Sequence, residues 1–342
     1  MRPSELITAL NYWIPTGRNI WVSGPPGVGK TSVIEAVIDG LDLDMAMLPP
    51  AVTLDPVDVR GIPHVTQTNG SAITAWAVPE FWPTDPNWKG VIVLDEFGKA
   101  APAVQAAFLQ ICYAPPGRPR QLGSYTVPEG ASFVIMSNRQ EDRAGEHRVI
   151  TPMLSRFVHL DFEVSLEDWQ KWAIGNGIDS RIRSFLNFKP AMLFTFDPKA
   201  NQRSFASPRT WELANDAVDA PESVRQASLA GCIGDGPAAE FAGFMEIADR
   251  LPEAREILAD PENATVPSEP SISYALVGAL AEEARKAEGR DKVLKGIGIF
   301  AGRMKPEFGV LLIRDTAEID PRIITIPETR EFLKTNRHLL AD

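Results

Sequence analysis

The sequence predicts an α/β fold, in which a five-stranded parallel sheet is followed by a mainly helical region. Five short apolar runs lie in the first half of the chain, and stretches with helical periodicity separate them. Beyond residue 163 the strand-like runs largely disappear and helical periodicity takes over. Because 342 residues suffice for two domains, we expect a sheet domain at 1–163 and a helical region at 164–342.

Each expected strand is a continuous apolar run, which is typical of parallel strands covered by helices on both faces. The expected strands are residues 19–23, 45–48, 90–94, 132–137 and 157–162. Helical periodicity marks residues 31–38, 103–112, 166–173, 208–217, 238–251 and 273–287. The run at 309–313 fits either a strand or a buried helix, because periodicity alone does not separate the two.

Composition and charge exclude several classes of protein. Hydrophobic residues make up 44% and charged residues 23% of the chain, which excludes a disordered or fibrous protein. The net charge is −11, and acidic residues outnumber basic ones in both halves, which argues against a dedicated nucleic-acid-binding domain. The two cysteines, Cys112 and Cys232, are too few for a disulfide framework or a cysteine-based zinc site.

The N-terminal residues and the lengths of the apolar runs predict a location. Glu5 stands where a signal peptide needs a basic start followed by an apolar run. No apolar stretch reaches the roughly 18 residues of a membrane-spanning helix. We therefore expect a soluble, cytoplasmic protein that does not contact a membrane.

The most specific motif is the glycine-rich sequence GPPGVGKT at residues 24–31, between the first expected strand and a helix. In this context the loop N–H groups and the positive end of the helix bind phosphate oxygens. Lys30 is expected to reach the β- and γ-phosphates, and Thr31 to bind Mg²⁺. The alternative is a simple Gly/Pro turn, but a chance match to the whole pattern is rare. The expected nucleotide contacts are Gly24, Pro25, Pro26, Gly27, Val28, Gly29, Lys30, Thr31 and Ser32.

Two carboxylates, Asp95 and Glu96, follow the buried run at 90–94. In an open α/β sheet the carboxyl ends of the strands face the ligand crevice. Asp95 is therefore expected to hold Mg²⁺, and Glu96 to orient or deprotonate the water that attacks the γ-phosphate. The alternative is that these residues only begin a helix, since carboxylates suit helix N-termini.

Three further polar residues extend the expected site. Asn138 follows the fourth apolar run and is placed to contact the γ-phosphate or the attacking water, although asparagine is also a common turn residue. Arg209 lies in the first turn of a helix that Ser207 is expected to cap, with Pro208 as its first residue. A cation there opposes the helix dipole, which indicates an anion outside the helix. Arg156 follows a short capped turn, where an arginine also suits the helix C-terminus for its own sake.

Together these motifs resemble those of the AAA+ ATPases, and within them the MoxR-like branch that includes CbbQ-type proteins with an insert in helix 2. The resemblance extends over residues 10–217 and implies an AAA+ P-loop nucleotide-binding domain at 1–163. It implies an α-helical lid and a C-terminal region at 164–342. The matching segments are GPPGVGKT at 24–31, VIVLDE at 91–96, the Asn138 position after FVIMS, LSRF at 154–157 and SPRTW at 207–211.

The resemblance also implies an activity, a cofactor and an assembly. It implies Mg²⁺-dependent hydrolysis of ATP to ADP, and an arginine finger that acts on the ATP of a neighbouring subunit in a ring, usually a homohexamer. Ser155 stands where relatives often have aspartate before the finger, which leaves Arg143 or Arg148 as residues that could share this role. The matches are Lys30 and Thr31 with Walker A, Asp95 and Glu96 with Walker B, Asn138 with sensor 1, Arg156 with the finger and Arg209 with sensor 2.

Two segments fit the hairpin insertions of this branch: residues 64–76, around the turn signal Asn69-Gly70, and residues 121–127. By resemblance these hairpins face a central pore; the alternative is a pair of surface hairpins without a partner. The resemblance implies a machine that remodels or matures a client protein, together with a von Willebrand factor A-domain protein. A nucleic-acid-translocating or nuclease-associated motor is the other possibility, which the acidic charge disfavours and which Arg118 and Arg120 leave open.

Overall fold

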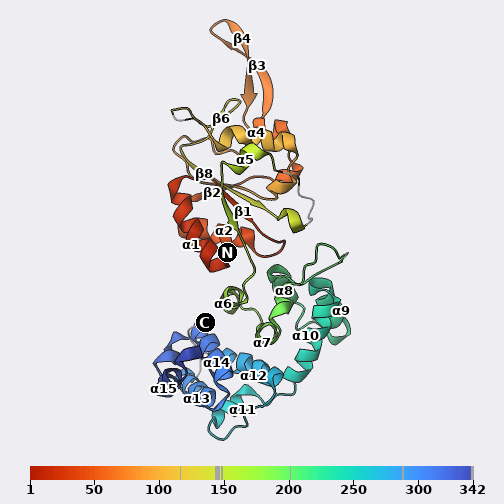
Figure 1. The fold of residues 1–342 in the computed structure, drawn as a ribbon, viewed down its shortest axis with the longest axis vertical. Helices are drawn as coiled ribbons and strands as arrows, with labels where there is room; N and C mark the ends of the chain where they lie inside the picture. Colours follow the sequence, from red (N-terminus) through yellow and green to blue (C-terminus); the bar gives the residue numbers. More distant parts are fainter. Residues whose placement is uncertain (116, 143–146, 148, 201, 287–288, 340–342) are drawn as a thin grey trace. The chain divides into compact units, whose positions relative to one another are not determined.

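A computed structural model of the chain describes residues 1–115, 117–142, 147, 149–200, 202–286 and 289–339. The chain divides into two compact units, which are considered separately below (Figure 1). The first unit is Met1–Val164 together with Asp197–Ala200. The second unit is Ser165–Phe196 together with Asn201–Asp342.

The first unit is built on a five-stranded parallel sheet with the strand order β2-β5-β8-β1-β9. All five apolar runs form these strands, so the predicted α/β sheet is confirmed. The expectation that most of the runs are buried is confirmed by β1, β5 and β8. The two edge strands β2 and β9 are largely exposed, because each has a neighbour on one side only. The strands are β1 (Ile20–Ser23), β2 (Asp44–Met47), β5 (Lys89–Leu94), β8 (Gly130–Ser137) and β9 (Val158–Asp161).

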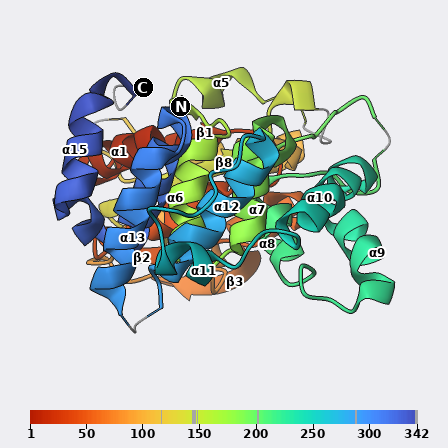
Figure 2. The same ribbon diagram turned by 90° about the horizontal axis from the view of Figure 1, so that it is seen from below.

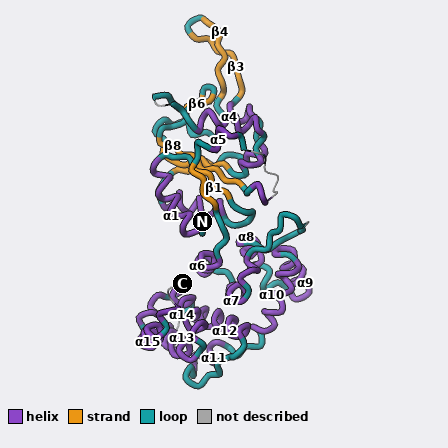
Figure 3. Tube along the Cα trace, viewed as in Figure 1, coloured by secondary structure: helices purple, strands orange, loops and turns teal. Residues whose placement is uncertain are grey.

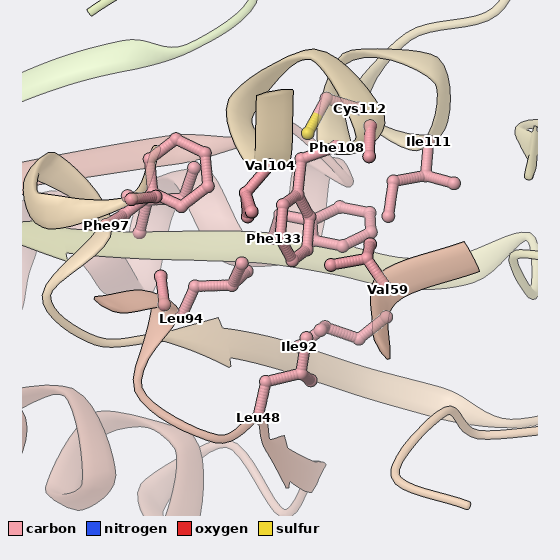
Figure 4. Close-up of a cluster of buried hydrophobic side chains, with 14 of the residues drawn as sticks. Leu48, Val59, Ile92, Leu94, Phe97, Val104, Phe108, Ile111, Cys112 and Phe133 are labelled. Atoms are coloured by element: carbon pink, nitrogen blue, oxygen red, sulfur yellow. The ribbon is translucent and has the colours of Figure 1, made fainter. Parts of the chain in front are cut away.

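Helices cover both faces of this sheet, as the continuous apolar runs predict. The helices α1 (Pro3–Trp13) and α2 (Lys30–Gly40) lie on one face, and α4 (Pro102–Cys112) lies on the other (Figure 1). Figure 4 shows the core under α4, where aromatic and aliphatic side chains from the strands and the helix interdigitate. Phe108 and Phe133 are fully buried there, and apolar burial of this kind supplies most of the stabilisation of such a layer.

Both predicted hairpins are present in the first unit. The longer one pairs β3 (Ile62–Thr68) with β4 (Ser71–Ala77) and extends away from the sheet (Figure 3). Its two-residue turn has positive φ at Asn69 (48°) and Gly70 (77°), the conformation that the Asn-Gly sequence favours. The shorter hairpin pairs β6 (Gln121–Leu122) with β7 (Tyr125–Thr126).

The two hairpins contact each other, which the sequence does not predict. The backbone N–H of Trp76 donates to Ser124 Oγ at 2.9 Å. A Cβ on Gly123 would lie 3.0 Å from the Trp76 ring, so the indole packs directly on the glycine backbone. The Arg60 guanidinium lies 5.5 Å from the centre of the Trp76 ring. The base of the longer hairpin is therefore fixed to the segment that leads into β8.

The described residues of the second unit form helices joined by loops, with no strand among them (Figures 2 and 3). The run at 309–313 lies in a helix, because its apolar side chains pack among other helices rather than in a sheet. None of the helices in the described part of the chain is long and apolar enough to cross a bilayer. The helices are α6 (Leu166–Gly175), α7 (Ser180–Phe188), α8 (Pro208–Asn215), α9 (Glu222–Ile233), α10 (Asp235–Ala248), α11 (Ala254–Ala259), α12 (Pro270–Glu283), α13 (Arg290–Arg303), α14 (Pro306–Ile319) and α15 (Pro327–Thr335).

A buried carboxyl group lies between the helices of the second unit. Asp315 on α14 is 3% exposed, and its hydrogen bonds to Asn187 and Arg314 are both long, at 3.5 Å. Burial raises the pKa of Asp315, and the nearby charges of Arg314 and Arg183 only partly offset this effect. The folded unit therefore binds a proton at Asp315 more tightly than the unfolded chain does.

We expect Asp315→Asn to stabilise the second unit at pH 8, by roughly 1–3 kcal/mol as for other imperfectly paired buried polar groups. The pKa of Asp315 is 3.8 in the unfolded chain and higher in the folded unit. The stability that the protonated side chain contributes at low pH is therefore lost as the pH rises from 3.8 through the folded-state pKa. Urea unfolding from pH 4 to pH 8 should therefore show a smaller loss of stability for the variant than for the wild type.

Asp179→Asn is the control for this measurement. Burial alone would raise the pKa of Asp179, but hydrogen bonds from Arg181 outweigh it and hold the pKa below its ordinary value. The Asp179 variant should therefore lose stability at neutral pH. Equal pH dependence of Asp315→Asn and wild type would contradict the prediction.

Candidate functional site

The order of the strands brings three polar segments to one edge of the sheet. The strand β8 lies between β1 and β5, and all three strands run parallel. The glycine-rich loop follows β1, Asp95 and Glu96 follow β5, and Asn138 follows β8. Since the carboxyl ends of parallel strands meet at the same edge, residues that are more than 100 positions apart face one crevice.

The glycine-rich loop has a conformation that needs glycine at three positions. Gly27 and Gly29 have φ of 74° and 94°, which other residues adopt only with strain. A Cβ on Gly24 would lie 2.8 Å from the carbonyl oxygen of Phe162, and the Gly24 N–H donates to the Ser137 carbonyl at 3.2 Å. The loop is thus held against the ends of β8 and β9, and it leads directly into the N-terminus of α2.

Lys30 folds back over this loop. Its Nζ donates to the carbonyl oxygens of Gly24 (2.7 Å) and Pro25 (2.9 Å), and to Asn138 Oδ1 (3.1 Å). The last contact joins the loop after β1 to the residue after β8. An ammonium group surrounded by neutral oxygens, beside a helix N-terminus, gives this part of the site a strong preference for an anion.

The two carboxylates after β5 are held in a tight turn. Glu96 has φ 54° and ψ 29°, a left-handed conformation that costs a residue other than glycine roughly 1–2 kcal/mol. Its backbone N–H donates to Asp95 Oδ1 at 2.7 Å. Its Oε1 lies 2.5 Å from the Nζ of Lys99. The carboxylate of Asp95 and the hydroxyl of Thr31 are hard oxygen donors of the kind that Mg²⁺ binds, so these residues fit the ion.

Arg156 lies near the amino ends of the strands β1 and β9, whereas the glycine-rich loop lies at their carboxyl ends. It precedes β9, whose first residue, Val158, pairs with Ile20, the first residue of β1. Its Nη1 donates to the carbonyl of Pro152, and its guanidinium lies 5.1 Å from the centre of the Tyr113 ring. The structure therefore does not bring Arg156 together with Lys30, Glu96 and Asn138 of the same chain.

Arg209 belongs to the second unit, where it is exposed in the first turn of α8. The predicted cap is confirmed, because Ser207 Oγ accepts from the Thr210 N–H and Pro208 is the first helical residue. No bonded partner of Arg209 occurs among the described residues. Arg143 and Arg148 lie outside the described residues.

Two basic residues of the first unit were not predicted as parts of the site. Lys99 contacts Glu96, as described above. Arg139, next to Asn138, donates from Nη2 to the Phe162 carbonyl at 2.9 Å, the same carbonyl that approaches Gly24. The i,i+3 spacing of Glu96 and Lys99 was a usable signal in the sequence. The contact of Arg139 was not, because Phe162 follows β9, which is separated from β8 by β1.

A cavity of about 460 Å³ lies beside Asn138, at the carboxyl ends of β1, β8 and β9. The Trp21 ring in its wall stacks on His159, with 5.6 Å between ring centroids, and Trp21 Nε1 donates to Ser137 Oγ at 2.8 Å. Its described walls include none of residues 24–32. The cavity therefore adjoins the expected phosphate site without containing it.

No family model matches this chain, and no curated protein matches it in sequence. A mutant of RuvB from Thermotoga maritima is similar in structure over 76% of this chain and 73% of its own, with 15% identity and a TM-score of 0.39. A second RuvB mutant from Thermotoga maritima is similar over 86% of this chain and 86% of its own, with 15% identity and a TM-score of 0.37. NtrX from Brucella abortus, in complex with ADP, is similar over 98% and 68%, with 14% identity and a TM-score of 0.35. Such distant likenesses carry no inference about this chain.

Proposed function

We propose that the protein is an AAA+ ATPase of the MoxR-like type, which hydrolyses ATP in a ring and uses the energy to remodel or mature a client protein. The observation that carries the ATPase assignment is the convergence of three strand ends. An anion-binding loop, a pair of carboxylates and an amide lie at one edge of the sheet, and Lys30 Nζ contacts Asn138 Oδ1 at 3.1 Å.

In this proposal the loop at 24–31 and Lys30 hold the phosphates, and Glu96 accepts a proton from the attacking water. The water oxygen bonds to the γ-phosphorus as the bond to the bridging oxygen of ADP breaks, and the proton passes to the Glu96 carboxylate. Asn138 orients the γ-phosphate or the water. Mg²⁺ bound near Thr31 and Asp95 would offset negative charge on the phosphates.

Two arginines support a ring and a mobile second unit in this proposal. Arg156 precedes β9, whereas the glycine-rich loop follows β1, so the two lie at opposite ends of these paired strands. In this proposal Arg156 therefore acts on the site of a neighbouring subunit. We propose a homohexamer, in which Arg156 completes the neighbour's site. The exposed Arg209 is the proposed sensor 2 of a lid formed by the second unit.

The charges near the hairpins favour a protein client over a nucleic acid. The hairpin at residues 62–77 contains no Lys, Arg, Asp or Glu, and it exposes Ile62 and Val65. Arg120 is committed elsewhere, since its guanidinium donates to the carbonyls of Pro128 and Ala131. A hairpin without charged side chains offers little to a phosphate backbone. We therefore propose a protein client, with a von Willebrand factor A-domain protein as a second partner.

Lys30→Ala tests the proposed function. The variant should bind ATP at least about ten-fold more weakly than the wild type, because the anion site loses its only charge-assisted donor from the loop. Titration with a fluorescent ATP analogue in the presence of Mg²⁺ measures this. Lys89→Ala, at the exposed amino end of β5, is the control and should bind ATP normally. Equal ATP affinity of Lys30→Ala and wild type would contradict the proposed function.

A further inference from the structure

The turn that follows β5 is held firmly by the core and by neighbouring segments. Phe97, at its centre, is fully buried and packs edge-on against Trp21 with 5.6 Å between ring centroids. The N–H of Lys99 donates to the Glu96 carbonyl at 2.9 Å, and the N–H of His147 donates to the Gly98 carbonyl at 2.7 Å. The backbone positions of both Glu96 and Lys99 are therefore set by the core and by neighbouring segments.

This rigid turn forces Glu96 into its left-handed conformation. Among the described residues, the other non-glycine residues with positive φ are Asp42 and Asn69, whose side chains tolerate that region well. Glutamate has no such preference, so the surroundings must impose it. Strain of this kind persists where a side chain has to be held in one particular place.

The Lys99 side chain meets the Glu96 carboxylate across this turn. The Nζ–Oε1 distance is 2.5 Å, and the Lys99 side chain is 24% exposed, against 38% for Glu96. The contact uses Oε1, and the second oxygen of the carboxylate has no bonded partner among the described residues. A glutamate side chain with three rotatable bonds is thereby fixed at one oxygen, which leaves the other oxygen to accept from a water molecule.

We propose that Lys99 is a positioning residue that orients Glu96 for proton abstraction. This inference rests on the proposed ATPase function and goes beyond it by assigning a second residue to the step. A general base must lie within hydrogen-bonding reach of the proton that it takes, and a third group commonly orients the base. Lys99 supplies that third group from within the same turn.

A purely stabilising role does not explain the arrangement as well. A partly exposed ion pair contributes only modestly to stability, and this one joins a lysine to a residue in a strained conformation. The pair of Lys171 and Glu167 on α6 provides a comparison. It has an Nζ–Oε1 distance of 2.9 Å, unstrained helical backbone and two side chains that are nearly half exposed.

Steady-state ATP hydrolysis by the full chain, with Lys99→Met, Lys99→Arg and the control Lys171→Met, tests the proposal. Lys99→Met should lower kcat about ten-fold or more, since a general base contributes about 10² to 10⁴ in rate and loses part of this when it is misaligned. KM and ATP affinity should stay within about two-fold of the wild type. Lys99→Arg should restore most of kcat, because a guanidinium can also donate to Oε1. Lys171→Met should match the wild type in every measurement.

The outcomes separate this inference from the proposed function. Wild-type kcat in Lys99→Met, or an increase, would overturn the role of Lys99 and leave the ATPase assignment intact. Equal losses of kcat in the Met and Arg variants would also overturn it, because conservative rescue fails. An inactive wild type would overturn both. If Lys99→Met does not fold, as judged by its melting temperature, Lys99→Gln replaces it under the same criteria. The neutral amide of glutamine donates to Oε1 more weakly than the ammonium of lysine does.

Discussion

Glu96→Gln should abolish ATP turnover while leaving ATP binding intact. The amide keeps the size of the carboxylate and can still accept from Lys99, but it cannot take a proton from water. Since general base catalysis contributes about 10²-fold or more, the expected fall in kcat is of at least that size. Phosphate release in the presence of Mg²⁺ and titration with a fluorescent ATP analogue measure the two properties on the same protein.

Glu129→Gln is the matched control, because Glu129 is exposed and precedes β8 at the other edge of the sheet. That variant should hydrolyse ATP at the wild-type rate. Full turnover by Glu96→Gln would remove the base assigned to Glu96. Loss of ATP binding together with turnover would show that Glu96 contributes to nucleotide binding rather than to activation of the attacking water.

Arg156→Ala should reduce hydrolysis by about 10³-fold with ATP binding retained, the scale on which a trans-acting arginine works in other phosphoryl-transfer enzymes. Mixed rings of Arg156→Ala and Glu96→Gln subunits should regain part of the activity. A Glu96→Gln subunit lacks its own base but still carries an intact Arg156. Where it lies beside an Arg156→Ala subunit with an intact Glu96, one complete site forms. Rates before and after subunit exchange measure the recovery.

The competing explanation is a local structural role for Arg156, which its contacts with Pro152 and Tyr113 allow. That role predicts a modest loss of stability and near-normal hydrolysis. Arg118→Ala, at an exposed position of the same unit, should change neither property. If mixed rings form and activity does not return, action in trans is excluded.

The sequence predicted those features of the fold that depend on residues close together in the chain. The five strands follow from apolar runs, the turn at Asn69-Gly70 from residues that favour positive φ, and the cap at Ser207 from a side chain that bonds its own helix. The pairing of the strand before Asn138 with the strand before Asp95 was also predicted.

The features that the sequence did not predict depend on distant parts of the chain. The exposure of β2 and β9 depends on which strands are at the edges, which the order of strands along the chain does not reveal. The left-handed backbone of Glu96 follows from the burial of Phe97 between Trp21 and Phe108, not from any preference of glutamate. The contact of Trp76 with Ser124 joins two hairpins that are 48 residues apart.

The two ends of the longer hairpin lie close together at its base, which allows the length of the hairpin to vary. Gly61, at φ 91°, lies so close to Ala77 that a Cβ would be 1.9 Å from its carbonyl oxygen. The chain thus enters and leaves the hairpin at nearly the same point, and Ile62 pairs directly with Ala77 there. Residues added or removed at the tip change the loop closure only slightly and leave the sheet untouched. The hairpin is therefore an element whose length and surface can change while the five-stranded sheet stays the same.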